Sequence, residues 1–303
     1  MSYDEAIERI ETLLDVYDQP YADSSAIPTM LVSQLARKHV KVALSGDGGD
    51  ETHLGYGAYQ WAKRLRNPLI RAARLPIAMG LSVLSNRLQR AARVFEYPNE
   101  NRKKSHIFSQ EQNCFSEIEI GRFLRPCAVR RFELNEEFSN YARKLSPEEE
   151  QSLFDMRYYL PDDLLVKVDR ASMLHGLEVR VPLLDHTLVE FGFNISSKLR
   201  SKPANAKYLL KEALARRVPR ELFERPKQGF AIPLEAWLKN ELAFLVSKYL
   251  SVSALEQTGV LDVTQVAGLV TQFKNGKSFL YNRVWLLIVL QQWLITNDAC
   301  ILQ

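Results

Sequence analysis

Residues 41–51 read KVALSGDGGDE, from Lys41 to Glu51, and this stretch decides the expected fold. The apolar run Val42–Leu44 is short and ends at a glycine-rich segment, which is typical of a buried strand. The glycines that follow let the backbone turn tightly and approach a ligand closely. Open α/β sheets bind their ligands at loops that follow the carboxyl ends of parallel strands. We therefore expect a ligand-binding loop directly after Leu44.

Two acidic residues of this loop, Asp47 and Asp50, add a second signal. Backbone N–H groups of such a loop can hold an anion, and a carboxylate can hold Mg²⁺ beside it. This combination indicates a nucleotide-phosphate and metal site. A glycine-rich strand-to-helix turn with solvated acids is the alternative, and the loop alone leaves both interpretations open.

The segment before the strand predicts a helix with Pro28 in its first turn and an apolar stripe of Ile27, Met30, Leu31 and Leu35. Helix, strand and glycine loop form the tail of a βαβ unit, which implies a parallel sheet. No convincing strand pattern precedes residue 41. We therefore expect a nucleotide domain without its first strands.

Composition and charge narrow the class of protein. The formal net charge of +4 is too small to argue for nucleic acid, and neither nucleic acid nor membrane is an expected partner. No stretch approaches the length of a membrane span, and the N-terminus lacks an apolar signal region. The cysteines, Cys114, Cys127 and Cys300, have no metal or disulfide spacing. A reducing, cytoplasmic location is expected.

The middle of the chain is rich in arginine and lysine. Residues 57–95 carry many basic residues between leucines and alanines. A basic amphipathic face can bind RNA or a membrane, but the lack of an aromatic stacking platform favours a solvated face. Residues 96–108 are polar and are a candidate linker or mobile loop.

Charged residues are interleaved with apolar ones between residues 147 and 195. Pro161 is expected to interrupt a helical pattern there. A salt-bridge network that holds helices together is one interpretation of the charged residues, and a functional wall is the other. The residues concerned are Asp169, Arg170, Glu178, Arg180 and Asp185.

Lys227 lies on a constrained loop, because proline and glycine bracket it in the run Arg225–Pro233. A lysine held near a phosphate stabilises charge on a transferring group. A surface lysine on a turn is the alternative. The preceding residues 206–217 predict a short cationic helix with Lys207 and Lys211 one turn apart.

Four blocks together resemble the C-terminal synthetase domain of glutamine-dependent asparagine synthetases, class B type. They occur in the family's order and spacing over most of residues 15–240. The blocks are DSSAIPT at 23–29, SGDGGDE at 45–51, YLPDDLLVKVDRASM at 159–173 with GLEVRVPLLDH at 176–186, and RPKQGFAIP at 225–233.

The resemblance implies a chemistry. In this family the domain uses ATP and Mg²⁺ to activate the side-chain carboxylate of aspartate as β-aspartyl-AMP, and ammonia then attacks the acyl-adenylate. Cations neutralise the leaving pyrophosphate. Aspartate and ammonia, free or derived from glutamine, are therefore the implied substrates. A partner chain that bears a glutaminase is a further implied possibility.

The resemblance also implies roles for single residues. Asp47 and Lys227 take the catalytic positions, and Asp50 takes that of a Mg²⁺ ligand. Asp169, Arg170, Glu178 and Arg180 match the helical wall, where roles are substrate-side or structural. The implied nucleotide-binding residues are Ser45, Gly46, Gly48, Asp50 and Glu51.

Three features depart from the family pattern. Ser2 stands where the family's glutaminase has its cysteine, so glutamine hydrolysis by this chain is not expected. The loop Ser-Gly-Gly-x-Asp-Ser, which holds the ATP phosphates in the family, is not found upstream of Asp23. Leu54 replaces a glycine after the acidic loop, which is expected to alter that turn. His53 is a candidate ligand, although a surface histidine is favoured.

We therefore expect an N-terminally truncated α/β fold, a Rossmann-like parallel sheet of the adenine-nucleotide α-hydrolase type, with a large helical C-terminal portion. The expected regions are a partial nucleotide-binding region at 1–70, a helical insertion and linker at 71–145, and a helical synthetase region at 146–303. A homo-oligomer is expected because an open sheet edge exposes apolar surface.

The expected function is an asparagine synthetase type amide ligase, a carbon–nitrogen ligase. The alternatives are a non-catalytic remnant or scaffold and one half of a split enzyme. A β-lactam synthetase type enzyme is disfavoured because that group usually has tyrosine where this chain has Asp47.

Overall fold

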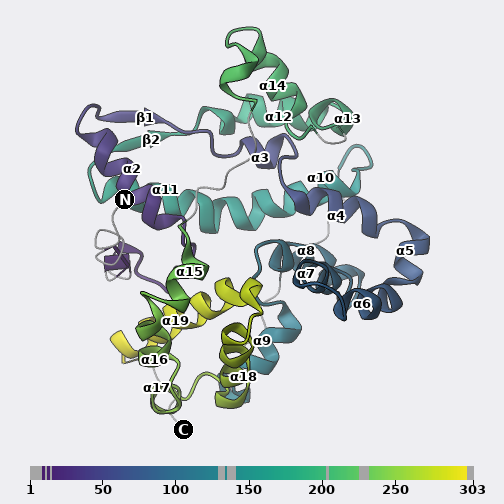
Figure 1. The fold of residues 1–303 in the computed structure, drawn as a ribbon. Coiled ribbons are helices and arrows are strands. Elements are labelled where there is room, and N and C mark those ends of the chain that lie inside the picture. The colour runs from purple at the N-terminus through teal and green to yellow at the C-terminus, as the bar shows by residue number, and fades with distance from the viewer. Residues whose placement is uncertain are drawn as a thin grey trace. The chain divides into compact units, whose positions relative to one another are not determined.

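The fold is known from a computed structural model, which describes residues 9, 10, 12, 13, 16–128, 134, 141–202, 205–224 and 232–298. The chain forms two compact units (Figure 1). Unit 1 comprises residues 1–27, 73–136 and 231–303, and unit 2 comprises residues 28–72 and 137–230. Each unit is assembled from separate chain segments, so these units do not test the expected division at residues 70 and 145, which stays a prediction.

Unit 2 contains the sheet and the helices around it. Strand β1 (Val42–Leu44) pairs in parallel with β2 (Glu178–Arg180), and Val42 lies opposite Glu178. The predicted strand and its parallel pairing are confirmed, but the expectation that this strand is buried is wrong, because Val42 and Leu44 are exposed. The α-helices are α2 (Ala26–Arg37, which begins at the end of unit 1), α3 (Gly49–Thr52), α4 (Gly57–Leu65), α5 (Pro68–Ala72), α10 (Pro147–Phe154), α11 (Leu165–Met173), α12 (His186–Asn194), α13 (Ser197–Arg200) and α14 (Tyr208–Ala215). The shorter helical turns are η4 (Pro182–Leu184) and η5 (Arg220–Leu222).

Helix α2 has the predicted place and Pro28 in its first turn. Ile27 and Met30 are buried, as a core stripe requires. Leu35 is exposed, so the predicted stripe is wrong at its C-terminal end. The helix therefore buries only its first turns in this structure.

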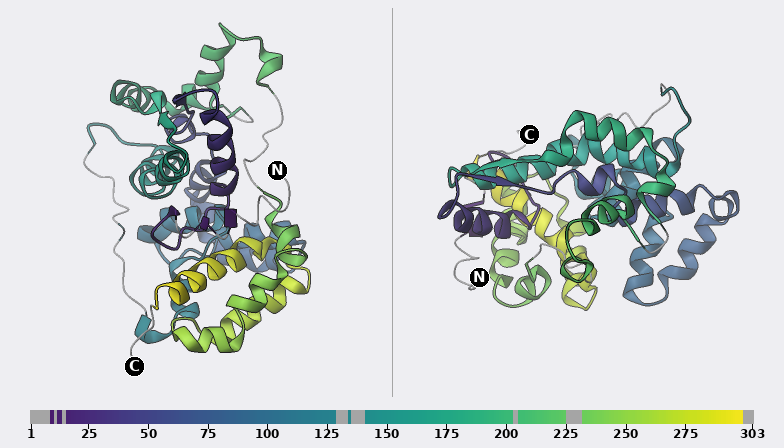
Figure 2. Two further views of the ribbon diagram at one scale, coloured as in Figure 1. Left: turned by 90° about the vertical axis from the view of Figure 1, so that its left-hand side faces the viewer. Right: turned by 90° about the horizontal axis from the view of Figure 1, so that it is seen from above.

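The expected interruption at Pro161 is wrong. Helices α10 and α11 are joined by η3 (Asp155–Leu164), a π-helical stretch that contains the proline, and the helix runs on without a break (Figures 1 and 2). A π-helix is wider than an α-helix and bonds i to i+5, which accommodates a residue without an N–H. Leu160 and Leu164 are buried on this stretch and hold it in the unit.

Apart from an isolated bridge between Leu124 and Leu261, the regular secondary structure of the described residues of unit 1 is helical. Its helices are α6 (Arg74–Ser82), α7 (Asn86–Val94), α8 (Lys103–Glu111), α9 (Glu117–Phe123), α15 (Leu234–Lys239), α16 (Ala243–Tyr249), α17 (Val252–Thr258), α18 (Val263–Lys274) and α19 (Tyr281–Thr296), with 3-10 turns η1 (Glu100–Arg102), η2 (Pro126–Ala128) and η6 (Ser278–Leu280). The run Val284–Leu290 lies in α19 and supplies much of the core of unit 1.

The interpretation of residues 96–108 as a linker or mobile loop is wrong. These residues enter η1 and α8, and His106 and Ile107 are buried. Asn99 caps the turn by accepting a hydrogen bond from the N–H of Arg102. The polar composition therefore reflects capping and surface positions of a helix rather than a linker.

No helix in the described part of the chain combines the length and the apolar character needed to cross a bilayer. In unit 2, the carboxyl end of β1 leads directly into the acidic loop. The fold therefore places that loop at the sheet edge where α/β proteins bind ligands.

Candidate active site

The loop after β1 is held in a tight turn by its own polar groups. The Ser45 hydroxyl donates a hydrogen bond to the Asp47 carboxylate. Gly48 has a φ of +82° and caps α3, which is the conformation that glycine adopts without strain. A Cβ atom at Gly48 would lie 2.1 Å from Cδ2 of Leu184. The second block of the sequence and the segment after β2 are thus packed against each other.

The side chain of Asp50 packs closely against the backbone of Gly55. A Cβ atom on Gly55 would lie 1.8 Å from Oδ1 of Asp50, so only glycine leaves room for this carboxylate. Leu54, the residue that departs from the family pattern, keeps a positive φ of 56° with its side chain buried. The turn therefore has a left-handed residue there, at a cost in backbone strain.

The carboxylate of Asp50 is paired with Lys207, whose Nζ lies 3.1 Å from Oδ1. Lys207 itself has a positive φ of 56° and is the N-cap residue of α14. A non-glycine residue in this conformation is held there by its surroundings. The structure thus brings a cation to the predicted metal ligand from a helix far away in the sequence.

Glu51, a predicted nucleotide-binding residue, is turned inward. Its Oε1 accepts a hydrogen bond from the Tyr56 hydroxyl at 2.8 Å, and its backbone carbonyl accepts one from Ser152 at 2.7 Å. Burial raises the pKa of Glu51 above its usual value. In this arrangement Glu51 anchors α3 to α10.

A buried ion pair holds the other end of α3. Arg200 donates a hydrogen bond to the carbonyl oxygen of Thr52 at 2.9 Å and pairs with Glu149. Arg143 binds both carboxylate oxygens of Glu149 at 2.9 and 2.7 Å. Burial alone would raise the pKa of Glu149, but the hydrogen bonds from Arg143 and the Ser146 N–H and the charge of Arg200 lower it to about 2. Glu149 is therefore a fixed anion that holds Arg200 on α3.

His53 follows α3 and is half-buried. Its Nδ1 lies 2.8 Å from the Thr52 hydroxyl oxygen. Burial, with the charges of Arg200 and Lys207, lowers the pKa of this imidazole. These surroundings favour the neutral form of the His53 imidazole, which lies next to the acidic loop.

Asp155, at the start of η3, is a further buried carboxyl group in this part of unit 2. Burial raises its pKa to about 8. The amide of Gln151 donates a hydrogen bond to Asp155 Oδ1 at 3.4 Å.

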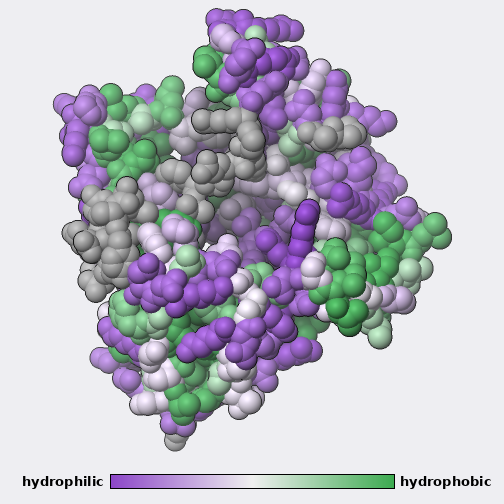
Figure 3. Space-filling view, in the orientation of Figure 1, coloured by the Kyte–Doolittle hydropathy of each residue, from purple (hydrophilic) through white to green (hydrophobic). Residues whose placement is uncertain are grey.

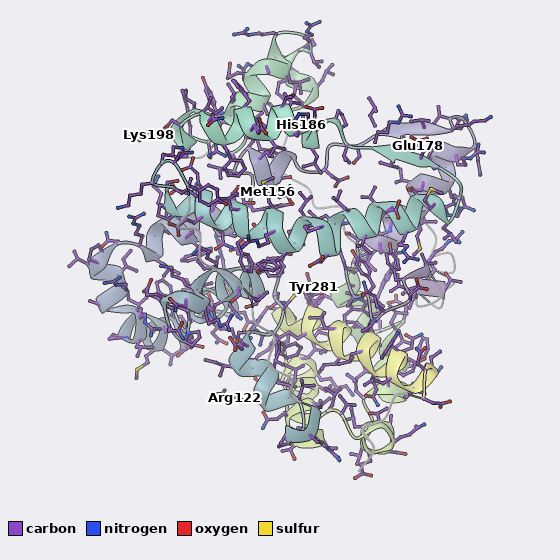
Figure 4. All side chains as sticks on the ribbon, turned by 180° about the vertical axis from the view of Figure 1, so that it is seen from behind. Arg122, Met156, Glu178, His186, Lys198 and Tyr281 are labelled. Carbon is purple, nitrogen blue, oxygen red and sulfur yellow. The ribbon has the colours of Figure 1, made fainter. Side chains whose placement is uncertain are left out.

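The predicted wall residues lie along α11 and β2. Glu178 and Arg180 pair with each other at 2.7 Å on the exposed face of β2, so this pair is not a buried network. Asp169 and Arg170 are exposed at the end of α11. In Figure 4, seen from behind, the long helix that carries Met156 runs below the strand that carries Glu178. Asp185 caps α12 by accepting a hydrogen bond from the Thr187 N–H.

Lys227 lies outside the described residues. Within the described ranges, no three His, Cys, Asp or Glu side chains gather as a metal site. Asp50 offers a partly exposed carboxylate, which is a hard oxygen donor of the kind that Mg²⁺ takes from proteins. Mg²⁺ is commonly held by one or two carboxylates together with substrate phosphates, so a single carboxylate here fits that ion.

The structure therefore brings Ser45, Asp47 and Asp50 together with Lys207, a residue that the sequence placed only on a cationic helix. Sequence reasoning also missed Ser152 and Arg200, which donate hydrogen bonds to carbonyl groups of α3, and Glu149, which pairs with Arg200. Their signal in the sequence is weak, because each lies about a hundred or more residues from the loop it holds. The roles expected for the predicted site residues stay predictions.

This fold and site define a class: a mostly helical α/β protein with a Rossmann-like parallel sheet and an acidic, glycine-rich loop at the end of a strand. The sequence model of the family described as asparagine synthase matches residues 1–295. The chain belongs to the asparagine synthase family, whose members are carbon–nitrogen ligases.

Similarity to named proteins agrees with the family. The chain is 28% identical over 314 residues to asparagine synthetase [glutamine-hydrolyzing] 1 of Bacillus subtilis (strain 168), covering 97% of this chain and 46% of the relative. It is 28% identical to a putative asparagine synthetase [glutamine-hydrolyzing] of Mycobacterium tuberculosis (strain ATCC 25618 / H37Rv), covering 97% and 45%. It is 30% identical over 123 residues to the human asparagine synthetase [glutamine-hydrolyzing], covering 39% and 21%. The chain thus spans about half the length of the first two relatives.

Proposed function

We propose that this chain carries out the synthetase half-reaction of an asparagine synthetase: ATP-dependent activation of the aspartate side-chain carboxylate, followed by amidation with ammonia. The observation that carries the proposal is the loop Ser45–Gly49 at the carboxyl end of β1. In and beside this loop, the Ser45 hydroxyl holds the carboxylate of Asp47, and the absence of a side chain at Gly55 leaves room for the carboxylate of Asp50. A loop of this kind in an asparagine synthase family member supports a nucleotide site.

The proposed first step is adenylation. A carboxylate oxygen of aspartate attacks the α-phosphorus of ATP, the bond from that phosphorus to the bridging oxygen breaks, and pyrophosphate leaves with the electron pair. Backbone N–H groups of Gly46 and Gly48 would bind the nucleotide together with the side chain of Ser45, because N–H groups in a glycine turn point toward an anion. Lys227 and Lys207 would neutralise the charge that develops on the phosphates.

The proposed second step is amide formation. Ammonia attacks the acyl carbon, AMP leaves with the carbon–oxygen electron pair, and the nitrogen loses one proton. The carboxylate of Asp47, held by the Ser45 hydroxyl, would accept that proton.

The metal part of the proposal rests on Asp50. Its carboxylate would hold Mg²⁺ together with the phosphates, and the ion would neutralise charge on the leaving pyrophosphate. Lys207 already shows that this carboxylate accepts a cation at 3.1 Å. Glu51, bonded to Tyr56, would keep α3 and hence Asp50 in place.

The proposed substrates are aspartate, ATP and ammonia, the last either free or released from glutamine by a glutaminase-bearing polypeptide. A reducing cytoplasm and a homo-oligomeric state belong to the same proposal. Glu178, Arg180, Asp169 and Arg170 are proposed on the substrate side of the loop, because β2 pairs directly with β1.

The test is aspartate-dependent release of pyrophosphate from ATP with Mg²⁺ and ammonium. The expected result is release that Asp50→Ala lowers by about 100-fold. Lys207→Met is expected to raise the KM for ATP by about tenfold. Lys211→Met is the matched control, because Lys211 bonds to Asn205 rather than to the loop. Release that needs no aspartate, or that survives Asp50→Ala, contradicts the proposal. Absence of release by the wild-type chain contradicts it too and favours a non-catalytic scaffold.

A further inference from the structure

Helix α6 of unit 1 presents an apolar side to solvent. Leu75, Met79 and Val83 follow one another at intervals of four residues, so they lie on one side of the helix and of the residue that ends it. They are 54%, 72% and 81% exposed, and Leu84, the next residue, is 50% exposed. Figure 3 shows hydrophobic residues gathered where Figure 1 labels α6. Single exposed apolar residues are ordinary, but a contiguous group of them marks an interaction surface.

The one charged residue of α6, Arg74, does not interrupt this apolar side. Its Nη1 donates hydrogen bonds to the carbonyl oxygens of Phe95 at 3.0 Å and Tyr97 at 2.8 Å, and its Cζ lies 4.3 Å from the centroid of the Tyr97 ring. From Leu75 to Ser82 the helix contains no charged residue. A helix that is apolar all round is normally buried on every side, in a protein core or in a membrane. Helix α6 is buried within unit 1 only on the side of Ala78, so its outward side lacks a cover.

Arginines border this apolar side. Between Glu51 and Glu96 the sequence contains eight lysines and arginines and no aspartate or glutamate, a local excess that the net charge of +4 hides. Arg87 and Arg90 are exposed in the first turns of α7. Acids rather than cations stabilise the start of a helix, so helix stability does not explain Arg87. The interpretation of residues 57–95 as a solvated face fits these two arginines, but it does not fit the outward side of α6.

The apolar residues and the two arginines together form a surface that we call the α6 face: Leu75, Met79, Val83, Leu84, Arg87 and Arg90. A second copy of the chain would place the arginines of both copies at one contact, which like charges disfavour. Interfaces with other proteins depend mostly on tryptophan, tyrosine and arginine anchors and seldom on leucine or valine, and the α6 face has no aromatic residue. A bilayer with anionic lipids accepts aliphatic side chains that project from a helix, and it attracts arginines.

We propose that the α6 face docks on a bilayer that contains anionic lipids. Its apolar side chains enter the boundary between headgroups and acyl chains, and Arg87 and Arg90 stay beside the anionic headgroups. Arg90 donates one hydrogen bond to the carbonyl oxygen of Glu111 at 2.7 Å, and its exposed guanidinium keeps its charge for the lipids. The contact is peripheral, since only side chains enter the bilayer. The inference goes beyond the proposed reaction, because it concerns where the chain is held.

The experiment measures co-sedimentation of the purified chain with vesicles of phosphatidylcholine and phosphatidylglycerol and, in parallel, with vesicles of phosphatidylcholine alone. The wild-type chain is expected to bind the anionic vesicles at least about tenfold more tightly than the neutral ones, because anionic headgroups attract the arginines. High salt is expected to weaken this binding, because it screens the attraction.

The double variant Met79→Asn with Val83→Asn is expected to weaken binding to anionic vesicles by at least about tenfold, because it removes apolar side chains without changing the charge. Phe244→Asn with Val252→Asn is the matched control, since these residues of α16 and α17 are 46% and 54% exposed and lie away from α6 in unit 1. The control is expected to bind as the wild type does. Arg87→Gln leaves the apolar side chains in place and carries the test if the first double variant fails to fold. It is expected to weaken binding to anionic vesicles by about fivefold.

Three results would overturn the proposal. The first is no binding of the wild-type chain to anionic vesicles, which would assign the α6 face to a protein partner. The second is equal vesicle binding by the two double variants. The third is self-association of the wild-type chain that Met79→Asn with Val83→Asn abolishes while vesicle binding stays unchanged, which would assign the face to a second copy. The readout is vesicle binding, so its failure and a failure of the proposed activity are separate results.

Discussion

Gly48 is the residue on which the geometry of the acidic loop depends most directly. Its positive φ and its contact with Leu184 leave no room for a side chain. Gly46, two residues earlier, has no heavy atom within 4 Å of an added Cβ. Backbone conformation and packing therefore require glycine at position 48, whereas packing does not require it at position 46.

Gly48→Ala is expected to lower the free energy of unfolding by about 1–3 kcal/mol, because it combines a left-handed backbone with a clash. Gly46→Ala is expected to cost less than about 1 kcal/mol. Urea unfolding of both variants checks this. Equal losses at the two positions would show that Leu184 does not pack on the loop as described.

Asp155 is expected to make stability depend on pH. Its pKa is raised from 3.8 to about 8 by burial, so the folded chain binds this proton more tightly than the unfolded chain. The stabilisation that comes from holding this proton in the folded chain is therefore fully present below about pH 4. It is lost as the pH rises toward about 8.

Asp155→Asn should remove this dependence. The difference in unfolding free energy between wild type and variant is expected to change by up to about 1.4 kcal/mol per pH unit in that window, always to the disadvantage of the wild type at higher pH. Urea unfolding at several pH values between 5 and 8 measures it. A difference that is constant with pH would mean that Asp155 is ionised in the folded chain.

Among the elements, the four-residue helix α3 is too short to be stable by itself, and its position comes from α10 and α13. Ser152 bonds to the carbonyl of Glu51, and Arg200 bonds to that of Thr52. These contacts satisfy carbonyl groups that a helix end leaves without partners. The acidic loop is therefore placed by elements from the second half of the chain.

Arg200→Met is expected to lower the free energy of unfolding by about 3–5 kcal/mol, because it leaves Glu149 buried with a single cation. Arg143→Ala should cost less, since the side chain of Arg143 is 43% exposed and that of Arg200 is fully buried. A double-mutant cycle with Glu149→Gln should show strong coupling between Arg200 and Glu149. Additive losses would contradict a shared ion pair.

Sequence patterns predicted β1, α2 and the glycine turn because their causes are local: apolar runs, a proline in a first turn and glycines. The continuous helix through Pro161 was missed because a π-helical stretch depends on burial of Leu160 and Leu164, which no local pattern reveals. The partners of α3 were missed for the same reason. The pairing of Asp50 with Lys207 joins residues 157 positions apart, and only the fold brings them together.

At the scale of the whole molecule, the chain consists of two compact units. Each has its own core: Trp285, Val284 and Ile288 are fully buried in unit 1, and Tyr59 and Ala171 in unit 2. A unit with its own core can unfold as a cooperative element.

Calorimetry is therefore expected to show two unfolding transitions. Gly48→Ala should lower the midpoint of one, and Trp285→Phe should lower the midpoint of the other, because it loses the hydrogen bond from the indole to the carbonyl of Ala22 at 3.0 Å. A single transition that both variants shift would show that the units unfold together.

Transfer of ¹⁸O from aspartate to AMP tests the central claim most directly. Aspartate labelled in its side-chain carboxylate is incubated with the chain, ATP, Mg²⁺ and ammonium, and the AMP is analysed by mass spectrometry. The account predicts that AMP gains one labelled oxygen, because the carboxylate oxygen that attacks the α-phosphorus leaves with it. Unlabelled AMP, or label in inorganic phosphate with release of ADP, would contradict an acyl-adenylate and with it the proposed role of the acidic loop.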